Sequence, residues 1–368
     1  MRFRYATEEN GRLVKKAHVY TQDEHKINFS DVDSQAVYII ERLQNSGYET
    51  YIVGGAVRDL ILGKKPKDFD IVSAANPTRI KRVFRNSRLI GRRFRLVHVY
   101  FGPKIFEVST FRSIKDGHTS NTFGTIEEDV KRRDFSMNAL FYDPLKQIVV
   151  DYVGGMKDIH KRVIKPIIPL AEIFTDDPVR MIRAVKYTAI TGFSLPFLLR
   201  WKIRRHSALL AGVSPSRLTE EMFKIINSPY VFEIVRNLDR EKIYCYLQPR
   251  ASMLFKTKPG FKDRYLKTIN ALNNEESSNV QGKNIFALVK DYLEDNIDWD
   301  ADIPVMDSFK STFIMAREFV LPINPPRKEL YNALRLLFAE HGVSIRKMRF
   351  KEGINRFVRI LKKPDLPD

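Results

Sequence analysis

Cysteine is almost absent from this sequence, because Cys245 is the only one among its 368 residues. A single thiol excludes an internal disulfide, and no group of cysteines and histidines has the spacing of a zinc site. No run approaches the ~20 apolar residues that a membrane-spanning helix requires, and Met1–Asn10 lacks the apolar core of a secretory signal. We therefore expect a soluble, cytoplasmic protein that does not associate with a membrane.

Acidic residues are in deficit relative to basic ones. Lysine and arginine number 63 against 44 aspartates and glutamates, which gives a formal net charge of +19. This excess favours a polyanionic partner, with nucleic acid ahead of an acidic membrane surface. The alternative is a well-solvated surface without such a partner. Hydrophobic residues make up 43% of the chain, enough for a sizeable core, and the length favours two or more compact units.

The first half of the chain alternates between strand and helix patterns. Residues 1–30 mix charged and polar residues, and we expect an N-terminal arm there. Ser30 or Asp31 is the expected cap of a helix that ends near Gly47. The following patterns predict strands at 51–53, 68–72, 96–101 and 105–111, helices at 56–62 and 77–86, and a mobile loop at 113–124.

Strand patterns fade after about residue 170. Helices are predicted at 198–210, 217–226, 285–292 and 330–338. We therefore predict an α+β fold in which a head with a mixed or antiparallel sheet and helices precedes an all-helical neck and body. The predicted domains are the arm at 1–30, the head at 31–165, the neck at 166–235 and the body at 236–368.

Two neighbouring carboxylates form the centre of the chemical pattern. Asp68 and Asp70 are two residues apart in a predicted strand, so both side chains are expected on one face. Like charges at that distance repel each other unless a cation bridges them. Oxygen ligands on a rigid strand suit Mg²⁺, which keeps other positions for water and phosphates. A lone Asp-x-Asp is more often a solvated strand face, so the surrounding pattern has to support the metal site.

Twelve residues separate a glycine pair from the first of these carboxylates. Gly54 and Gly55 fit a turn in which backbone N–H groups at a helix N-terminus approach a triphosphate. Arg58 lies one turn into that helix and is a candidate for the same phosphates, whereas we interpret Asp59 as structural. A lone Gly-Gly is commonly only a turn, but strand, Gly-Gly, helix and Asp-x-Asp in this order are far more specific.

Seven segments in family order extend this pattern over roughly residues 48–226. They are Val53–Asp59, Asp68–Asp70, Glu107–Arg112, Glu128-Asp129, Arg132–Ala139, Asp151–Gly155 and Asp176–Arg183. In these segments the sequence resembles the class II nucleotidyltransferases of the polymerase β superfamily, which comprise bacterial tRNA CCA-adding enzymes and bacterial poly(A) polymerases.

The resemblance implies a two-metal mechanism with ATP as substrate. Asp68 and Asp70 would coordinate two Mg²⁺ ions, for which Mn²⁺ can substitute. The family motif makes Asp134 the first choice for a third catalytic carboxylate, and an ion pair with a neighbouring arginine is its structural alternative. Glu107 competes for that role, because it begins a strand that can lie beside Asp68–Ile71. Arg133 is the implied phosphate or nucleotide contact.

The resemblance also implies that the protein selects the base. Asp177 and an arginine of the same motif, Arg180 or Arg183, would hydrogen-bond the incoming base, since Asp accepts and Arg donates. In the structural alternative, Asp177 caps a helix that begins at Pro178, and Arg180, Arg183 and Lys186 form a solvated helical face. Asp176 and Lys186 depart from the Glu and Arg that are common in the family, and Lys cannot offer a bidentate fork.

Several segments favour poly(A) addition over CCA addition. Leu89–Val99, Gly63–Asp70 and Phe84–Arg88 are similar to the poly(A) group, and Ser216–Glu221 is similar to a family neck motif. Residues 79–95 contain eight basic residues and no acid, and Arg92, Arg93 and Arg95 are the predicted RNA contacts. A solvated helix face with a loop is the alternative explanation of these charges.

We therefore predict a monomeric polynucleotide adenylyltransferase that acts on single-stranded 3′ ends of mRNA or tRNA, in association with RNA-decay proteins. Basic and aromatic residues at 346–357 suit single-stranded RNA, although a core helix with snorkelling cations explains them equally well. Two alternatives stay open. One is a tRNA CCA-adding enzyme that uses CTP and ATP, and the other is a catalytically inactive RNA-binding homologue.

Overall fold

The computed structural model describes residues 2–7, 12–91, 96–113, 122–274, 282–299 and 303–345. The chain divides into two compact units, Met1–Ser252 and Met253–Asp368, and each is described by itself. The predicted domain boundaries at residues 30, 165 and 235 stay predictions. Within the described residues, no helix has both the length and the apolar character that crossing a membrane demands.

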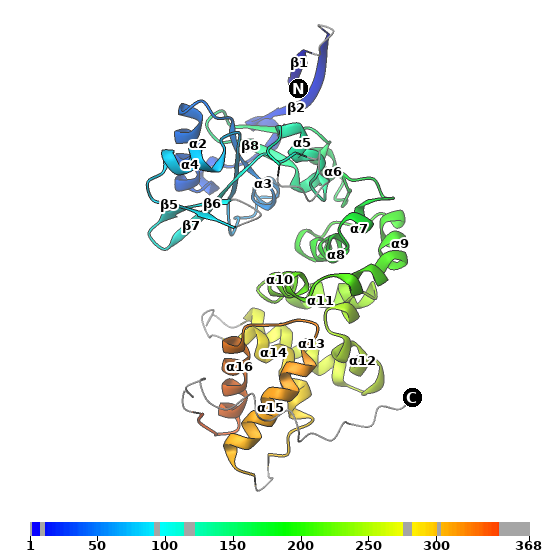
Figure 1. Cartoon of the computed structure of the whole chain (residues 1–368). Helices are drawn as coiled ribbons and strands as arrows, with labels where there is room; N and C mark the ends of the chain where they lie inside the picture. Colours follow the sequence, from blue (N-terminus) through cyan, green and yellow to red (C-terminus); the bar gives the residue numbers. More distant parts are fainter. Residues whose placement is uncertain are drawn as a thin grey trace. The chain divides into compact units, whose positions relative to one another are not determined.

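A nine-stranded sheet organises the first unit (Figure 1). Its strands are β1 (Arg2–Thr7), β2 (Leu13–Thr21), β3 (Thr50–Val53), β4 (Asp70–Ser73), β5 (Ser87–Ile90), β6 (Leu96–Phe101), β7 (Lys104–Thr110), β8 (Leu140–Asp143) and β9 (Ile148–Asp151). The order is β1-β2-β9-β8-β3-β4-β7-β6-β5, and the described neighbours pair antiparallel except for β4 and β7. The mixed sheet of the predicted α+β head is confirmed.

Helices cover both faces of this sheet. The helices of the head are α1 (Gln22–His25), η1 (Phe29–Asp31), α2 (Ser34–Asn45), α3 (Gly55–Ile61), α4 (Pro77–Val83), α5 (Ile126–Lys131), η2 (Ser136–Asn138) and α6 (Gly155–His160). On one face, α2 packs against α4 and against β3 and β4. On the other face, Ile126 and Val130 of α5 join Tyr51, Val53 and Val72 in one hydrophobic cluster. Burial on both faces explains the apolar run of β3.

The first helix of the head begins later than the sequence predicts. Its cap is Asp33, whose carboxylate accepts hydrogen bonds from the backbone N–H groups of Gln35 and Ala36. The predicted caps fail because Ser30 and Asp31 belong to the preceding 3₁₀ turn η1. Four aspartate or serine residues within residues 30–34 offer several caps, and only the helix start in three dimensions distinguishes them.

The segment expected to be an arm contributes two strands to the sheet. β2 pairs with β9 and buries Ala17 in the core cluster, and β1 pairs with β2 at the sheet edge. Figure 1 shows this hairpin projecting from the rest of the head. The charged and polar residues that predicted an arm therefore belong to a two-stranded extension with an exposed face.

Every described element after β9 is helical, as predicted. The elements are α7 (Ile173–Asp176), α8 (Val179–Thr191), α9 (Phe197–His206), η3 (Ser207–Gly212), α10 (Pro215–Ile226), α11 (Val231–Arg240), η4 (Tyr244–Tyr246), α12 (Pro249–Thr257), α13 (Phe261–Asn274), α14 (Lys283–Glu294), α15 (Val305–Phe319) and α16 (Arg327–Glu340). In the neck, α8 packs against α10 and α11. In the second unit, α14 packs against α13, α15 and α16.

Candidate active site

A glycine turn joins β3 to α3 at the edge of a pocket. Gly54 has φ 80°, a left-handed conformation that favours glycine, and it serves as the N-cap of α3. A Cβ atom placed on Gly54 would lie 3.6 Å from Oδ2 of Asp70. The Asp70 carboxylate therefore lies beside the turn, on the side where a side chain would project, and a group bound at the turn would also meet this carboxylate.

Asp68 and Asp70 are close but do not share a strand. β4 begins at Asp70, which pairs with Val53, so Asp68 precedes the strand and the predicted strand at 68–72 starts two residues too early. Although Asp70 is exposed, its pKa is raised, first because the surrounding protein removes water and then because Glu107 and Asp68 repel its charge. The predicted crowding of negative charge is therefore present, but it involves a third acid.

Glu107 is that third acid, and the strand register places it beside Asp70. β4 and β7 run parallel with Ile71 opposite Val108, so Glu107 lies next to Asp70 and on the same face of the sheet. The Glu107 side chain is 54% exposed, and its Oε1 lies 3.5 Å from Nε2 of His98 on β6. The two carboxylates thus face the same space from adjacent strands.

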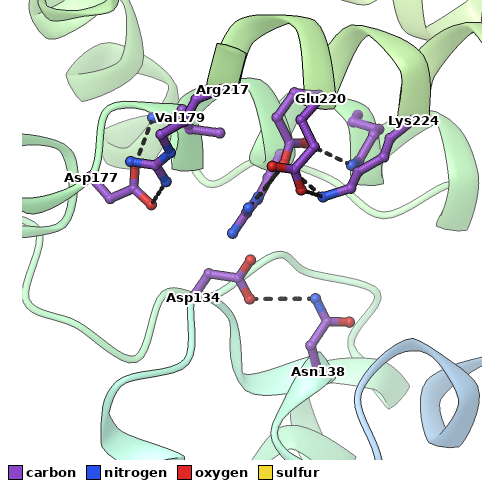
Figure 2. A network of polar contacts seen from close by, with 10 residues as sticks. Asp134, Asn138, Asp177, Val179, Arg217, Glu220 and Lys224 are labelled. Atoms are coloured by element: carbon purple, nitrogen blue, oxygen red, sulfur yellow. Dashed lines mark hydrogen bonds and ion pairs between the residues drawn. The ribbon is translucent and has the colours of Figure 1, made fainter. Parts of the chain in front are cut away.

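Asp134, the first choice for the third carboxylate, has different neighbours. Its Oδ1 accepts from the backbone N–H of Phe135 at 2.8 Å and from the Asn138 amide at 3.5 Å (Figure 2). Burial raises the pKa of Tyr187 and the charge of Asp134 adds to this, so the carboxylate faces helix α8. No ion pair between Asp134 and the adjacent arginines is found within the described part of the chain, because these bind Asp129.

One buried acid holds the arginines beside the turn. Asp129 is fully buried, and its two oxygens accept from Nε of Arg132 at 2.9 Å and from Nε and Nη2 of Arg133 at 3.0 and 2.8 Å. Burial alone would raise the pKa of Asp129, but these two guanidiniums lower it below its ordinary value. Burial and Arg132 lower the pKa of the neighbouring Arg112 to about 10. The predicted phosphate contact Arg133 is therefore held in a fixed cationic group.

Arg58 lies in α3 as predicted, but it is not among the described residues that line the pocket. Its side chain is buried and donates to Asp59 Oδ1 at 2.9 and 2.7 Å and to Asn138 Oδ1 at 2.8 Å. A Cβ atom on Gly55 would lie 3.5 Å from its Nη2, so the guanidinium packs under the turn. These contacts indicate that Arg58 stabilises the turn from below, and they confirm Asp59 as a structural partner.

On the neck side, Asp177 is both a cap and half of an ion pair. Its Oδ1 accepts from the backbone N–H of Val179 at 3.2 Å, and its Oδ2 accepts from Nη2 of Arg217 on α10 at 2.8 Å (Figure 2). Asp177 is 4% exposed. Arg180, the expected partner in the same motif, is buried against Asp176 and the carbonyl of Ile173 instead.

The basic residues of α8 do not form a solvated face. Arg183 donates to Oε1 of Glu221 at 3.0 and 2.9 Å, and Lys186 donates to its Oε2 at 3.1 Å. Glu221 is 2% exposed. Burial alone would raise its pKa, but Lys186, Arg183 and Lys224 lower this pKa to about 2. Burial lowers the pKa of Lys186 despite this partner. The solvated-face alternative is wrong because α10 covers these side chains.

The head and neck residues of the first unit enclose a pocket of about 400 Å³. Its walls are formed by Gly54, Gly55, Asp70, Arg112, Arg132, Arg133, Asp134, Asn138, Asp177, Arg180, Arg183, Tyr187 and Arg217. Among the described residues, six arginines and three aspartates line it, so cationic side chains outnumber carboxylates in this wall. Sequence reasoning missed Arg112, Arg132, Asn138, Tyr187 and Arg217 as wall residues, although three of them lie inside the resembling motifs and Arg217 inside the neck motif.

The predicted RNA contacts Arg92, Arg93 and Arg95 lie outside the described residues, as do residues 346–357. The preceding basic residues of α4, β5 and their connection are exposed. They are Arg79, Lys81, Arg82, Arg85 and Arg88. The described part of this basic segment is thus a solvent-facing cationic surface, which leaves both interpretations of the segment open.

The carboxylates of Asp70 and Glu107 are chemically suited to bind a divalent cation. Asp70 and Glu107 present oxygen ligands from neighbouring strands, and after desolvation the charges of Glu107 and Asp68 add to the raised pKa of Asp70, a repulsion that a cation would relieve. The described residues include no group of three His, Cys, Asp or Glu side chains converging on one point. Mg²⁺ commonly uses one or two carboxylates and completes its shell with water and phosphates, so this geometry is compatible with it.

Most of the sheet of the head and part of the pocket lie in a segment that a family model matches. Residues 50–165 match the family model of the poly A polymerase head domain. Residues 192–254 match the model described as "Probable RNA and SrmB- binding site of polymerase A". The resemblance to class II nucleotidyltransferases is confirmed by these matches to the head and RNA-binding models.

Individual relatives carry both activities of this family in their names. Poly(A) polymerase I of Escherichia coli O6:H1 is 41% identical over 253 residues, 64% of this chain and 54% of that protein. The CCA-adding enzyme of Geobacillus kaustophilus is 37% identical over 219 residues, 58% of this chain and 54% of that enzyme. The matched region thus spans about half the length of these curated relatives.

The structural neighbours include a crystal structure of the Bacillus stearothermophilus CCA-adding enzyme in complex with CTP. It aligns with a TM-score of 0.60 and 28% identity, over 84% of this chain and 70% of that one. The likeness covers helical parts of the chain as well as the head.

Proposed function

We propose that this chain adds AMP from ATP to RNA 3′ ends without a nucleic-acid template. The observation that carries the proposal is the pocket itself, because six arginines, Asp70 and the glycine turn are among the described residues that line it. A triphosphate needs several cations and a carboxylate-held metal at its reacting end, and few other ligands need both in one space.

The head side of the pocket is suited to hold the phosphates. Arg112, Arg132 and Arg133 supply guanidiniums, and the backbone of Gly54 allows a close approach because no Cβ intervenes. Asp68, Asp70 and Glu107 would hold Mg²⁺, which when bound supplies positive charge for the triphosphate and lowers the pKa of the attacking 3′-hydroxyl. Asp134 remains a candidate for the reaction, but its contacts favour a role in positioning Asn138 and helix α8.

The neck side is suited to select the base. Asp177 accepts and Arg217 donates, and these directions complement an exocyclic amino group beside a ring-nitrogen acceptor. Adenine and cytosine both present that pair, whereas guanine and uracil present a carbonyl beside a ring N–H. The pair therefore favours ATP and CTP over GTP and UTP without a template, and it does not by itself separate adenine from cytosine.

A second candidate, CCA addition to tRNA, follows from that ambiguity and from the likeness to CCA-adding enzymes. Poly(A) addition is favoured because the match to poly(A) polymerase I is longer and more identical than the match to the CCA-adding enzyme. A monomeric state, RNA-decay partners and a cytoplasmic location remain predictions.

The test is incubation of the purified chain with tRNA and with an unrelated RNA, each nucleotide in turn, and a sizing gel. Long tails with ATP alone on both RNAs support poly(A) addition. A few C and A residues added only to tRNA support CCA addition. No product with Mg²⁺ or Mn²⁺ supports an inactive homologue. Asp70→Asn is the negative control, and Glu41→Gln, an exposed carboxylate of α2, is its matched active control.

A further inference from the structure

The N-terminal hairpin carries a row of aromatic rings on one face. Phe3 and Tyr5 of β1 have ring centroids 6.3 Å apart, and Phe3 lies 5.0 Å from His18 of β2. His18 is in turn stacked on Tyr20 with centroids 6.2 Å apart. Residues two apart along a strand share a face, so these four rings form one ladder across two strands.

The opposite face of the hairpin is its anchor. Ala17 is buried in the core cluster of the head, and Arg4 pairs with Glu49 at 2.6 Å and donates to the Tyr51 hydroxyl at 3.2 Å. The hairpin is thus held to the sheet through one side. The aromatic side is outside that core, and Tyr5 at its outer end is 55% exposed.

Positive charge accompanies the rings. The Lys15 ammonium lies 3.5 Å from the centroid of the Phe3 ring, on the aromatic face. A bulge between Arg4 and Tyr5 leaves Lys16 as an extra, exposed residue of β2. Residues 1–21 contain five lysines and arginines against Glu8 and Glu9, and the described strands contain no acid. The face therefore complements an anion that also has flat apolar surfaces.

We propose that this hairpin face binds single-stranded RNA, with bases stacked on the aromatic ladder and a phosphate on Lys15. Proteins that hold single strands without sequence preference combine stacking rings with a cationic groove in this way. A helix of a partner protein would need an apolar groove to bind here. The hairpin instead has aromatic rings accompanied by cations, which suit RNA better. The inference extends the proposed function, since it assigns a part of the RNA substrate to a surface outside the pocket.

Tyr5→Ala is the sharpest variant, because Tyr5 is the most exposed ring of the ladder and, among the described residues, its ring contact is with Phe3. We expect this variant to bind a short single-stranded adenylate RNA about tenfold more weakly. Tyr5→Phe should bind like the parent, because it keeps the ring. Tyr38→Ala is the matched control, since Tyr38 on α2 is 45% exposed and also has one edge-to-face neighbour, Phe101.

Binding is measured by fluorescence anisotropy over a range of salt, without nucleotide or divalent metal, so the result does not depend on catalysis. Lys15→Gln should reduce the log–log salt slope by about 0.7, the value for one phosphate of a single strand. The exposed Lys157 of α6 provides the control Lys157→Gln, which should leave the slope unchanged. Equal binding by Tyr5→Ala and the parent would overturn the inference.

Ultraviolet cross-linking of the parent protein to the same RNA removes any doubt about folding of the variants. Peptides from residues 2–7 or 12–21 should carry the cross-linked nucleotide. Cross-links confined to other peptides would contradict the inference, as would capture of a protein or a second copy by a hairpin that binds no RNA. If the Tyr5→Ala variant polymerises and binds RNA like the parent, the result contradicts this inference but not the proposed function. If the parent binds RNA through the hairpin but never polymerises, the result contradicts only the proposed activity.

Discussion

The carboxylates on the two sides of the pocket have opposite electrostatic surroundings. Behind the neck wall, the buried Glu221 carboxylate binds the wall residue Arg183 and is neutralised by Arg183, Lys186 and Lys224, so that its pKa falls to about 2. On the head wall, Asp70 lies among other carboxylates, and its pKa rises. A satisfied ion network needs no ligand, whereas repelling carboxylates do. The comparison therefore assigns stability mainly to the neck wall and binding mainly to the head wall.

The largest expected effect is on activity, from a change in the head wall. Asp70→Asn should reduce nucleotide transfer by about a thousandfold or more, because a charge that stabilises the reacting end of the triphosphate is lost. The fold should survive. A carboxylate whose pKa is raised in the folded state costs stability once pH exceeds its ordinary value, so its removal should raise or preserve the melting temperature at neutral pH.

Melting curves and initial rates of Asp70→Asn and the control Glu41→Gln check this expectation. The stability difference between Asp70→Asn and the parent should disappear in acid, below the ordinary pKa of an aspartate, because the parent carboxyl is then protonated in both states. Parent-like transfer by Asp70→Asn, or a lowered melting temperature at neutral pH, would reverse the assignment of the head wall.

The next effect is on stability, from a change in the neck wall. Glu221→Gln should destabilise the protein by about 3–5 kcal/mol, because Arg183 and Lys186 are left without their buried acid. The depressed pKa of Glu221 contributes stability above about pH 4.5, and this is lost as pH falls toward 2. The difference between variant and parent should therefore shrink over that range.

Urea unfolding at several pH values measures this difference. Glu220→Gln is the matched control, because Glu220 binds the same Lys224 but is 63% exposed. Its effect should stay below about 1 kcal/mol, as for a surface ion pair. Equal losses in the two variants would show that the buried network adds nothing beyond a surface pair.

A third experiment separates the two candidates for the additional carboxylate. Glu107→Gln should lower the transfer rate by about a hundredfold and weaken the response to Mg²⁺, because it removes a negative charge beside Asp70. Asp134→Asn should change the rate less, since its bonds to Phe135 and Asn138 suit a positioning role. Rates measured over a Mg²⁺ titration compare the two. A larger defect in Asp134→Asn would restore the assignment based on the family motif.

The position of this site could be predicted from the sequence, but its internal pairing could not. Gly54, Asp70 and Asp177 line the pocket as expected, since motif residues near strand and helix ends converge in this fold. The start of β4 was misplaced because strand pairing begins opposite Val53, and pairing is not visible in a local pattern. Arg217 and Glu221 lie 35 to 40 residues from their α8-side partners, a separation at which no local rule applies.

The segment Asp151–Gly155, one of those that carry the family resemblance, has a structural role. Asp151 accepts from the N–H groups of Val153, Gly154, Gly155 and Met156 and so caps α6. A Cβ atom on Gly155 would lie 2.3 Å from a backbone carbonyl oxygen of the head, so only glycine fits. This motif identifies the family because it shapes the scaffold, and it contributes no side chain to the pocket wall.

The smallest predicted effect concerns Asp177. This neck residue is proposed to bind the base of the nucleotide whose phosphates the head wall holds. Asp177→Ala should leave Arg217 without its acceptor and remove the base partner, which costs about ten- to hundredfold in preference for ATP over GTP or UTP. Asp177→Asn isolates the capping role, because an amide oxygen can still accept from Val179. If Asp177 selects the base, Asn should keep the melting temperature of the parent and lose preference, since its amide can also donate to the wrong base. If Asp177 is only a cap, Ala should melt earlier, Asn should not, and the ratio of kcat/KM values for ATP and UTP should match the parent in both.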